Sequence, residues 1–332
     1  ATLWDGKLSL EADWFYNLNY DILANMSGDK APSMGGYYYT IANHNRYANY
    51  GVEWTLSHQN KVNLLGKPFR YNASLNMTYA KNKWLRYLDE PNAQEWRKHV
   101  GTSVDAAYVW VAEGLFRSEE EIDRSAWYGS RPNLGDIKYK DLNGDGKIDE
   151  QDRSRIGRSN RPEIMMGLNL GASWNGFDFS AQFTGGFKFD VSMLGTYYNG
   201  YDDNTIWSQT FKEGANSPLW LVKEAYSIDN PNGTYPRITL STVSHGGDNG
   251  AASTFWMRKG NYVRLKTAQI GYSLPKAMMH KIGIENIRIY VEGSNLFTLD
   301  SLPKGIDPES PAVNNGYYPQ QRTFLGGINI TF

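Results

Sequence analysis

Two alternating segments joined by a two-residue link restrict the fold of this chain more than any other feature. In residues 164–174 every second side chain is apolar, and residues 177–184 repeat the pattern. The link is Asn175-Gly176, and Asn-Gly between alternating segments is the strongest short signal for a tight β-hairpin. Because successive side chains of a strand point to opposite faces, one face of the hairpin is expected to be apolar and the other polar.

The alternation recurs along the chain and predicts eight strands. They are expected at residues 8–22, 52–57, 69–79, 164–174, 177–184, 268–274, 287–291 and 324–332. Short links at 59–68, 175–176 and 275–286 alternate with long links at 23–45, 83–161, 188–259 and 300–320. Short turns at one end and long loops at the other, with an apolar outside and a polar inside, are typical of outer-membrane barrels. A soluble β-protein also alternates, but loops of this length count against it.

Composition supports the same class. The 332 residues include 14% aromatic residues and 33 glycines, which favour strands and tight turns, and the formal charge of -1 gives no sign of a nucleic-acid partner. The chain has no cysteine, which excludes disulfides and thiolate metal sites. No apolar run reaches the roughly 18 residues of a transmembrane helix, whereas barrel strands need only about 9 to 11 alternating residues. The predicted fold is therefore all-β, an antiparallel transmembrane β-barrel with long extracellular loops.

The loop at 83–161 contains an EF-hand-like segment, residues 141–152. Its expected ligands for Ca²⁺ are Asp141, Asn143, Asp145, the Lys147 carbonyl, Asp149 and Asp152. Gly146 permits the sharp turn, but Asp152 replaces the usual Glu and no strong flanking helices are evident. The alternative is that Asn-Gly-Asp-Gly is turn chemistry on a solvated loop. A bound ion would have a structural role.

Other candidate sites have simpler interpretations, and no enzyme is predicted. Ser118 to Glu121 fits a capping box that opens a short helix. The five histidines share no metal-ligand spacing, and the chain has no HExxH, GxSxG or phosphate-loop motif. Two roles are predicted for the loop aromatics: binding, by stacking on sugars or packing on a partner, or packing of the loops together. These aromatics are residues 37–39, Trp207, Phe211, Trp220, Tyr226 and Trp256. Glu53, Arg70, Asn72 and Asn76 are expected to face the barrel interior, with no substrate role assigned.

A series of short motifs covers nearly the whole chain in a fixed order. They are Glu113-Gly-Leu-Phe116, Ser118-Glu-Glu-Glu-Ile122, residues 135–146, Asn175-Gly-Phe-Asp178, Asn261-Tyr-Val-Arg-Leu-Lys266, Gly271-Tyr-Ser-Leu-Pro275, Asn295-Leu-Phe297, Asp307-Pro-Glu309 and the terminal Phe332. Together they resemble the C-terminal part of SusC-like (SusC/RagA-type) TonB-dependent outer-membrane transporters of the Bacteroidetes. The set is specific, although no single motif is.

The resemblance implies a barrel of about 22 strands around an N-terminal plug. Residues 1–332 would be the C-terminal part of that barrel, its last eight or so strands, with the plug and the N-terminal strands outside this chain. It also implies location in the cell outer membrane and energised import of oligosaccharides or peptides, with glycans favoured. The implied partners are the TonB complex, acting through the N-terminal region, a SusD-like surface lipoprotein as the lid, and outer-membrane lipid.

Two alternatives remain open from the sequence. One is a structural or assembly component built on the same barrel. The other is an independent eight-stranded barrel, a class that includes enzymes. The pairing of residues 8–22 separates the transporter fragment from the independent barrel, because only an independent small barrel needs this strand to pair with the last one.

Overall fold

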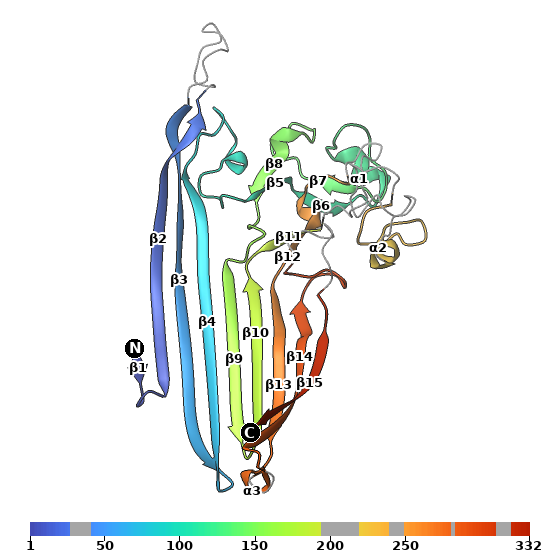
Figure 1. Ribbon diagram of the computed structural model, residues 1–332. Coiled ribbons are helices and arrows are strands. Elements are labelled where there is room, and N and C mark those ends of the chain that lie inside the picture. Colours follow the sequence, from blue (N-terminus) through green and yellow to red (C-terminus); the bar gives the residue numbers. More distant parts are fainter. Residues whose placement is uncertain (27–40, 194–218, 239–248, 280–282, 310–319) are drawn as a thin grey trace.

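One antiparallel sheet dominates the computed structural model, which describes residues 1–26, 41–193, 219–238, 249–279, 283–309 and 320–332 (Figure 1). In order of their neighbours, its nine strands are β1 (Thr2–Leu3), β2 (Leu8–Asn25), β3 (Ile41–Leu64), β4 (Lys67–Arg86), β9 (Ile164–Trp174), β10 (Phe177–Phe187), β13 (Tyr262–Ser273), β14 (Asn286–Asp300) and β15 (Thr323–Thr331). Each strand therefore pairs with the sheet strand that precedes or follows it along the chain.

The register of these strands sorts the side chains into polar and apolar rows. One row is polar from β2 to β15: Ser9, Ser57, Ser74, Asn169, Gln182, Thr267, Ser294 and Thr323. A row on the opposite side is apolar: Leu10, Leu56, Leu75, Leu168, Phe183, Leu265 and Phe297. We call these two sides the polar face and the apolar face. Large side chains on the apolar face are exposed, including Trp14 at 72% and Ile270 at 53%, as expected where lipid covers the surface.

All eight predicted strands are present, but several boundaries are wrong. The predicted link at 59–68 is a two-residue turn, Leu65-Gly66, because β3 and β4 continue to Leu64 and from Lys67. At its other end β3 begins at Ile41, inside the predicted loop 23–45. The residues at that end of β3 include Asn43, His44, Asn45 and Arg46, so they lack the alternation that marks a strand in the sequence.

The long loops form a second layer beyond one end of the sheet, here called the loop layer (Figure 1). Its elements are β5 (Ala107–Trp110), β6 (Ala112–Leu115), α1 (Glu119–Arg124), β7 (Ile137–Tyr139), β8 (Arg153–Ile156), β11 (Asp190–Ser192), α2 (Leu219–Glu224), β12 (Met257–Lys259) and three 3₁₀ turns at Glu95–Arg97, Glu150–Asp152 and Thr254–Trp256. The short helix α3 (Lys276–Met279) lies at the opposite end of the sheet (Figure 1). Across the described residues, no helix is both long and apolar enough to span a membrane.

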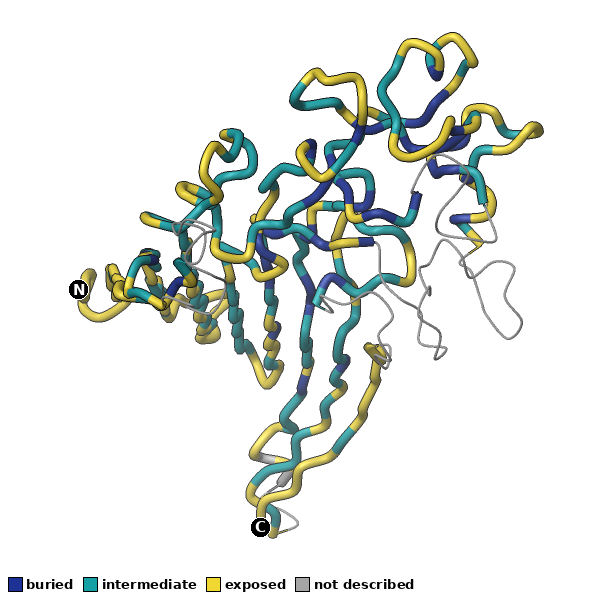
Figure 2. The backbone as a smooth tube through the Cα atoms, turned by 90° about the horizontal axis from the view of Figure 1, so that it is seen from above, coloured by how far each residue is buried: buried dark blue, intermediate teal, exposed yellow. Residues whose placement is uncertain are grey.

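The hydrophobic core of the described residues lies in the loop layer rather than against the sheet. Trp110 and Trp256 are 2% and 1% exposed and belong to one cluster with Ile137 and Leu221. Figure 2 shows the buried residues concentrated among the loops, while much of each strand is exposed or half-buried. The sheet therefore leaves both of its faces available for contacts outside this part of the chain.

Candidate functional site

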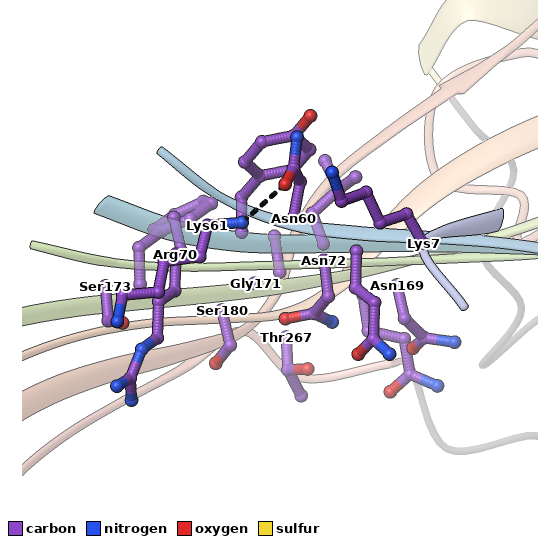
Figure 3. A pocket seen from close by; sticks show the side chains of 17 residues that line it. Lys7, Asn60, Lys61, Arg70, Asn72, Asn169, Gly171, Ser173, Ser180 and Thr267 are labelled. Carbon is purple, nitrogen blue, oxygen red and sulfur yellow. Dashed lines mark hydrogen bonds between the residues drawn. The ribbon is translucent and has the colours of Figure 1, made fainter. Parts of the chain in front are cut away.

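The candidate site is a pocket of about 1000 Å³ beside the central strands of the sheet. Side chains from five strands contribute to it: Lys61 (β3), Arg70 and Asn72 (β4), Asn169 and Ser173 (β9), Ser180 and Gln182 (β10) and Thr267 (β13). Figure 3 shows Asn72, Asn169, Ser180 and Thr267 extending to the same side of the ribbon. Their common side is the polar face defined by the strand register.

Glycines on β9 create the room that the asparagines of β4 occupy. Gly171 lies opposite Asn72, and Gly167 lies opposite Asn76. A Cβ atom added to Gly171 would lie 2.4 Å from Asn72 Oδ1, and one added to Gly167 would lie 2.5 Å from Asn76 Oδ1. Both distances are far below van der Waals contact, so each amide lies across a position that only glycine leaves empty. The glycines therefore set how the amides lie on the polar face.

The amides of the pocket have unused hydrogen-bonding capacity. Within the described part of the chain, the side chains of Asn72, Asn169 and Gln182 make no hydrogen bond, and Lys61 and Arg70 have no carboxylate partner. Lys61 and Arg70 are paired directly across β3 and β4. An amide offers both donors and acceptors, whereas Lys and Arg only donate. The pocket can therefore bind neutral polar groups and, at the Lys61 end, anionic ones.

A polar network fixes the neighbouring part of the polar face. The Arg288 guanidinium binds Asp178 through two hydrogen bonds, Nε to Oδ2 at 2.9 Å and Nη2 to Oδ1 at 2.5 Å. Its Nη2 also donates to Gln269 Oε1 at 2.6 Å, and Gln269 Nε2 donates to Glu292 Oε2 at 2.8 Å. The network joins β10, β13 and β14. Two-pronged Arg–carboxylate contacts hold their geometry well, so this part of the wall is pre-ordered.

The structure places all four predicted interior residues on the polar face. Arg70 and Asn72 line the pocket, whereas Glu53 and Asn76 lie on the same face outside it. The contributors from β9, β10 and β13 were not predicted from the sequence. These residues form the polar half of each alternating run in the sequence. Which of them lie together in the pocket depends on the pairing of strands that are distant along the chain.

In the 141–152 segment the side-chain oxygens accept backbone hydrogen bonds. Asp152 is fully buried; its Oδ1 accepts from Leu142 N at 2.8 Å, and its Oδ2 accepts from Asp149 N at 2.9 Å. Asp141 accepts from the N–H groups of Gly144 and Gly146 at 2.6 and 2.8 Å. The Asp152 carboxylate thus joins the two ends of the segment in the way that turn residues satisfy backbone donors.

The calcium site stays a prediction. The oxygen ligands predicted from the sequence, which are Asp141, Asn143, Asp145, the Lys147 carbonyl, Asp149 and Asp152, all lie in this segment. In the described residues, no three His, Cys, Asp or Glu side chains converge as a group that could hold a metal ion. The ligand chemistry suits Ca²⁺, while the present arrangement of the carboxylates serves backbone bracing.

The structure confirms the N-cap half of the capping box predicted at Ser118, whereas the Glu121 carboxylate accepts from Arg117 N in place of Ser118 N. Helix α1 begins at Glu119, and the Ser118 hydroxyl accepts a hydrogen bond from Glu121 N at 3.2 Å. The Glu121 carboxylate accepts from Arg117 N at 3.0 Å and from Lys138 Nζ at 3.2 Å. These donors favour the ionised form and hold the pKa of Glu121 below its usual value. The acidic run therefore builds local structure.

Loop aromatics pack the loop layer together wherever the structure describes them. Trp256 is buried in the core, and Trp220 and Tyr226 pack against it. Gly135 lies directly beneath the Tyr226 ring, where an added Cβ would be 2.2 Å from Cδ1. Of the two predicted roles, packing is confirmed for these three residues. Trp207, Phe211 and residues 37–39 lie outside the described residues.

At the base of the loop layer, His99 lies in a nearly closed aromatic and acidic environment. Its ring stacks on Tyr87 with centroids 3.5 Å apart, and its Nδ1 lies 2.5 Å from Asp89 Oδ1. Burial lowers the pKa of His99, and the hydrogen bond to Asp89 opposes this effect in part. The stacked Tyr87 ring and the Asp89 carboxylate hold the imidazole in place, so His99 serves as a fixed hydrogen-bonding group.

Comparison with known proteins identifies relatives along the whole chain. TonB-dependent receptor P26 of Formosa agariphila is 27% identical over 354 residues, covering 100% of this chain and 33% of the receptor. TonB-dependent receptor P3 of the same organism is 25% identical over 360 residues, with the same coverage. This chain thus spans about one third of the length of the curated relatives it matches. No protein-family model matches the chain.

Solved structures show the same fold. A structure of the RagAB peptide transporter matches 99% of this chain and 34% of its own chain, with a TM-score of 0.65 at 20% identity. The RagAB peptide importer in its open-open state matches with a TM-score of 0.66. These relatives are receptors and importers rather than enzymes, as predicted, and they support the predicted outer-membrane location. The comparisons confirm the all-β barrel class and support the resemblance stated from the motifs: along its whole length the chain is similar to about one third of TonB-dependent receptors and of the RagAB peptide transporter.

Proposed function

We propose that this chain forms the C-terminal part of an outer-membrane TonB-dependent transporter that imports oligosaccharides or peptides. Its polar face lines the solute path, and its apolar face contacts lipid. A SusD-like surface lipoprotein covers the loop layer, and the TonB complex acts through an N-terminal plug outside this chain. The observation that carries the proposal is the polar row that crosses eight strands beside a pocket with free amides, opposite an exposed apolar face.

The edges of the sheet support the larger barrel within this proposal. Among the described residues, β15 pairs only with β14, while β2 pairs with β3 and, over two residues, with β1. Residues 8–22 do not pair with the last strand, so the independent eight-stranded barrel is not supported. Unpaired strand edges are not stable in lipid, because each N–H and C=O group there needs a partner. Further strands must therefore complete both edges in the membrane.

The pocket amides give the first test of solute contact. In the full-length receptor, the double variant Asn72→Leu with Asn169→Leu is expected to raise the concentration of solute needed for half-maximal uptake by about 3- to 10-fold, the range for losing one net hydrogen bond. The probes are a fluorescent peptide pool and a fluorescent oligosaccharide pool, each with and without an uncoupler. Thr78→Val is the control, because Thr78 lies on the polar face outside the pocket.

The outcomes separate the alternatives. Uncoupler-sensitive uptake of one pool that the double variant weakens and the control does not supports import through this face. A receptor that imports neither pool, while its deletion alters envelope composition, would favour the structural or assembly role. Uptake unchanged in the double variant would show that the solute does not touch these amides.

We also propose a structural Ca²⁺ ion at residues 141–152, supported by the hard oxygen ligands that the segment offers. Asp152→Asn removes one of the two oxygens that accept backbone N–H groups, so the segment is expected to lose about 1–3 kcal/mol of local stability. Asp145→Asn is the matched variant, because Asn keeps the acceptor that Lys147 N uses. Hydrogen exchange in this segment is the measurement. The bound ion is supported if EDTA speeds hydrogen exchange in the wild-type segment and if both variants reduce the protection that Ca²⁺ gives. If only Asp152→Asn speeds exchange, the carboxylate stabilises the segment through its backbone hydrogen bonds without an ion.

A further inference from the structure

A four-residue ionic cluster joins the loop-layer end of the sheet to the segment that follows β14. The Arg264 guanidinium lies between two carboxylates, with Nη2 2.6 Å from Asp307 Oδ1 and Nη1 2.6 Å from Glu309 Oε2. Its Nε donates to Thr298 Oγ1 at 2.8 Å, and Lys266 Nζ lies 3.0 Å from the same Glu309 oxygen. Arg264 is only 3% exposed. Two cations and two carboxylates balance the charge, which makes such burial tolerable.

A β-bulge places both cations where they reach this segment. Arg264 pairs with Thr184 on β10 and Thr298 on β14, which puts it on the polar face. Against β10 the register of β13 shifts between Leu265 and Thr267, so Lys266 is the extra residue of a bulge on that side. Against β14 the shift at the same place puts the extra residue on β14, between Ser294 and Phe297. Bulges re-aim a side chain and recur beside functional sites. Here the bulge lets Lys266 join Arg264 at Glu309 while Thr267 resumes the polar row.

Residues 301–309 also have apolar and backbone attachments. Leu302 and Ile306 pack against a buried pair, Phe189 and Val191. The Ser301 hydroxyl donates to the backbone oxygen of Lys259 at 3.0 Å. Within the segment, Asp307 Oδ1 accepts from Glu309 N at 2.9 Å, so the two carboxylates are held in position to receive Arg264. The segment is thus docked at both of its ends.

We propose that Arg264 is a positioning residue that holds residues 301–309 on the polar side of the sheet as a fixed wall of the solute path. This proposal rests on the proposed transport function. Its physical basis is that one buried guanidinium satisfies two carboxylates that protein largely covers, since the side chains of Asp307 and Glu309 are 22% and 20% exposed. Removing Arg264 leaves two carboxylates near one remaining cation, Lys266. The segment is then expected to leave the wall, and the path is expected to widen.

Tryptic cleavage after Lys304 measures the docking directly, because Lys304 is exposed within the segment and cleavage needs local opening. In the full-length receptor in outer-membrane vesicles, Arg264→Met is expected to speed this cleavage by about 10-fold or more. Lys266→Met, which removes one contact and leaves the Arg264 fork, is expected to change it by less than about 3-fold. Arg264→Lys, which keeps the charge without the planar fork, is expected to lie between wild type and Arg264→Met.

The length of the longest oligomer that is imported measures the role of Arg264 in transport. With labelled oligomers of increasing length, Arg264→Met is expected to admit longer oligomers than wild type, and Arg264→Lys is expected to restore the wild-type limit in part. Cleavage at the wild-type rate in both Arg264 variants would overturn the docking. Faster cleavage with an unchanged size limit, in a receptor that imports, would overturn the positioning role. A wild-type receptor that imports no probe refutes the proposed function, but the cleavage rates still test whether Arg264 docks residues 301–309. If Arg264→Met does not assemble, the cleavage rate of Arg264→Lys tests the docking instead.

Discussion

An arginine at position 56 is expected to block assembly of the barrel, whereas an arginine at position 55 is expected to be tolerated. The two residues are adjacent on β3, and the register puts Leu56 in the apolar row and Thr55 beside Glu11 and Asn76 on the polar face. A cationic side chain on the lipid face near the bilayer midplane costs about 2–4 kcal/mol, while one facing the interior keeps its hydration. In Thr55→Arg the new guanidinium also gains an acidic neighbour, Glu11.

Heat-modifiable migration of the full-length receptor, extracted from outer membranes, measures the folded fraction for Leu56→Arg and Thr55→Arg. The expected result is a strong loss for Leu56→Arg and near-wild-type folding for Thr55→Arg. Equal tolerance of both would contradict a lipid-facing apolar face. A loss confined to Thr55→Arg would reverse the assignment of the two faces. Both variants introduce the same side chain with the same charge, so the face that receives it is the main difference between them.

The sequence predicts the sheet well because lipid and water impose a strict alternation on every strand within the membrane. Prediction from the sequence fails in segments outside the membrane, because there lipid and water no longer impose the alternation. The start of β3, with Asn43, His44 and Asn45, continues the ladder by backbone hydrogen bonds alone, and no side-chain pattern reveals it. The small strands of the loop layer are likewise too short, at three or four residues, to show a period.

The pocket could be predicted only in part, for a different reason. Arg70 and Asn72 were recognised as interior residues from one strand, but their partners come from strands that begin far along the chain. The same limit applies to the ion pair of Asp178 with Arg288, whose residues are 110 positions apart. Segment 141–152 shows the opposite difficulty: the motif is clear, but the same carboxylate oxygens serve a cation or a backbone N–H.

Replacing Arg237 with methionine is expected to loosen the loop layer while the sheet stays intact. Asp136 is fully buried, and its Oδ1 accepts from Arg237 Nε at 2.7 Å and from Asn249 Nδ2 at 2.8 Å. Its Oδ2 accepts from Asn133 N at 2.8 Å. The Arg237 side chain is 29% exposed, whereas the carboxylate it neutralises is buried. Removing the guanidinium leaves that carboxylate with neutral donors only, and a buried charge that loses its partner costs about 3–5 kcal/mol.

Hydrogen exchange of the full-length receptor checks this expectation, with Arg131→Met as the matched control. Arg131 contacts two carboxylates, Glu119 and Asp123, at 2.7 and 2.8 Å, but all three side chains are about half exposed, so its loss is expected to change little. Adding Asp136→Asn to Arg237→Met removes the stranded charge and is expected to recover much of the protection. Equal effects of the two single variants would contradict a special role for the buried pair.

The position of the exchange change tests how the loop layer is built. Asn249 Oδ1 accepts from Ile137 N at 2.8 Å, and Asn249 O accepts from Trp256 Nε1 at 2.9 Å, so Asp136 connects to the aromatic core through one amide. Loosening at residue 237 is therefore expected to reach Ile137 and Trp256, which belong to other segments of the chain. Faster exchange confined to the neighbours of Arg237 would mean that the loops are stable one by one. Faster exchange in the segments around Arg237, Ile137 and Trp256 together would mean that they unfold as one cooperative unit over the end of the barrel. The Asp136 carboxylate would then stabilise that whole unit.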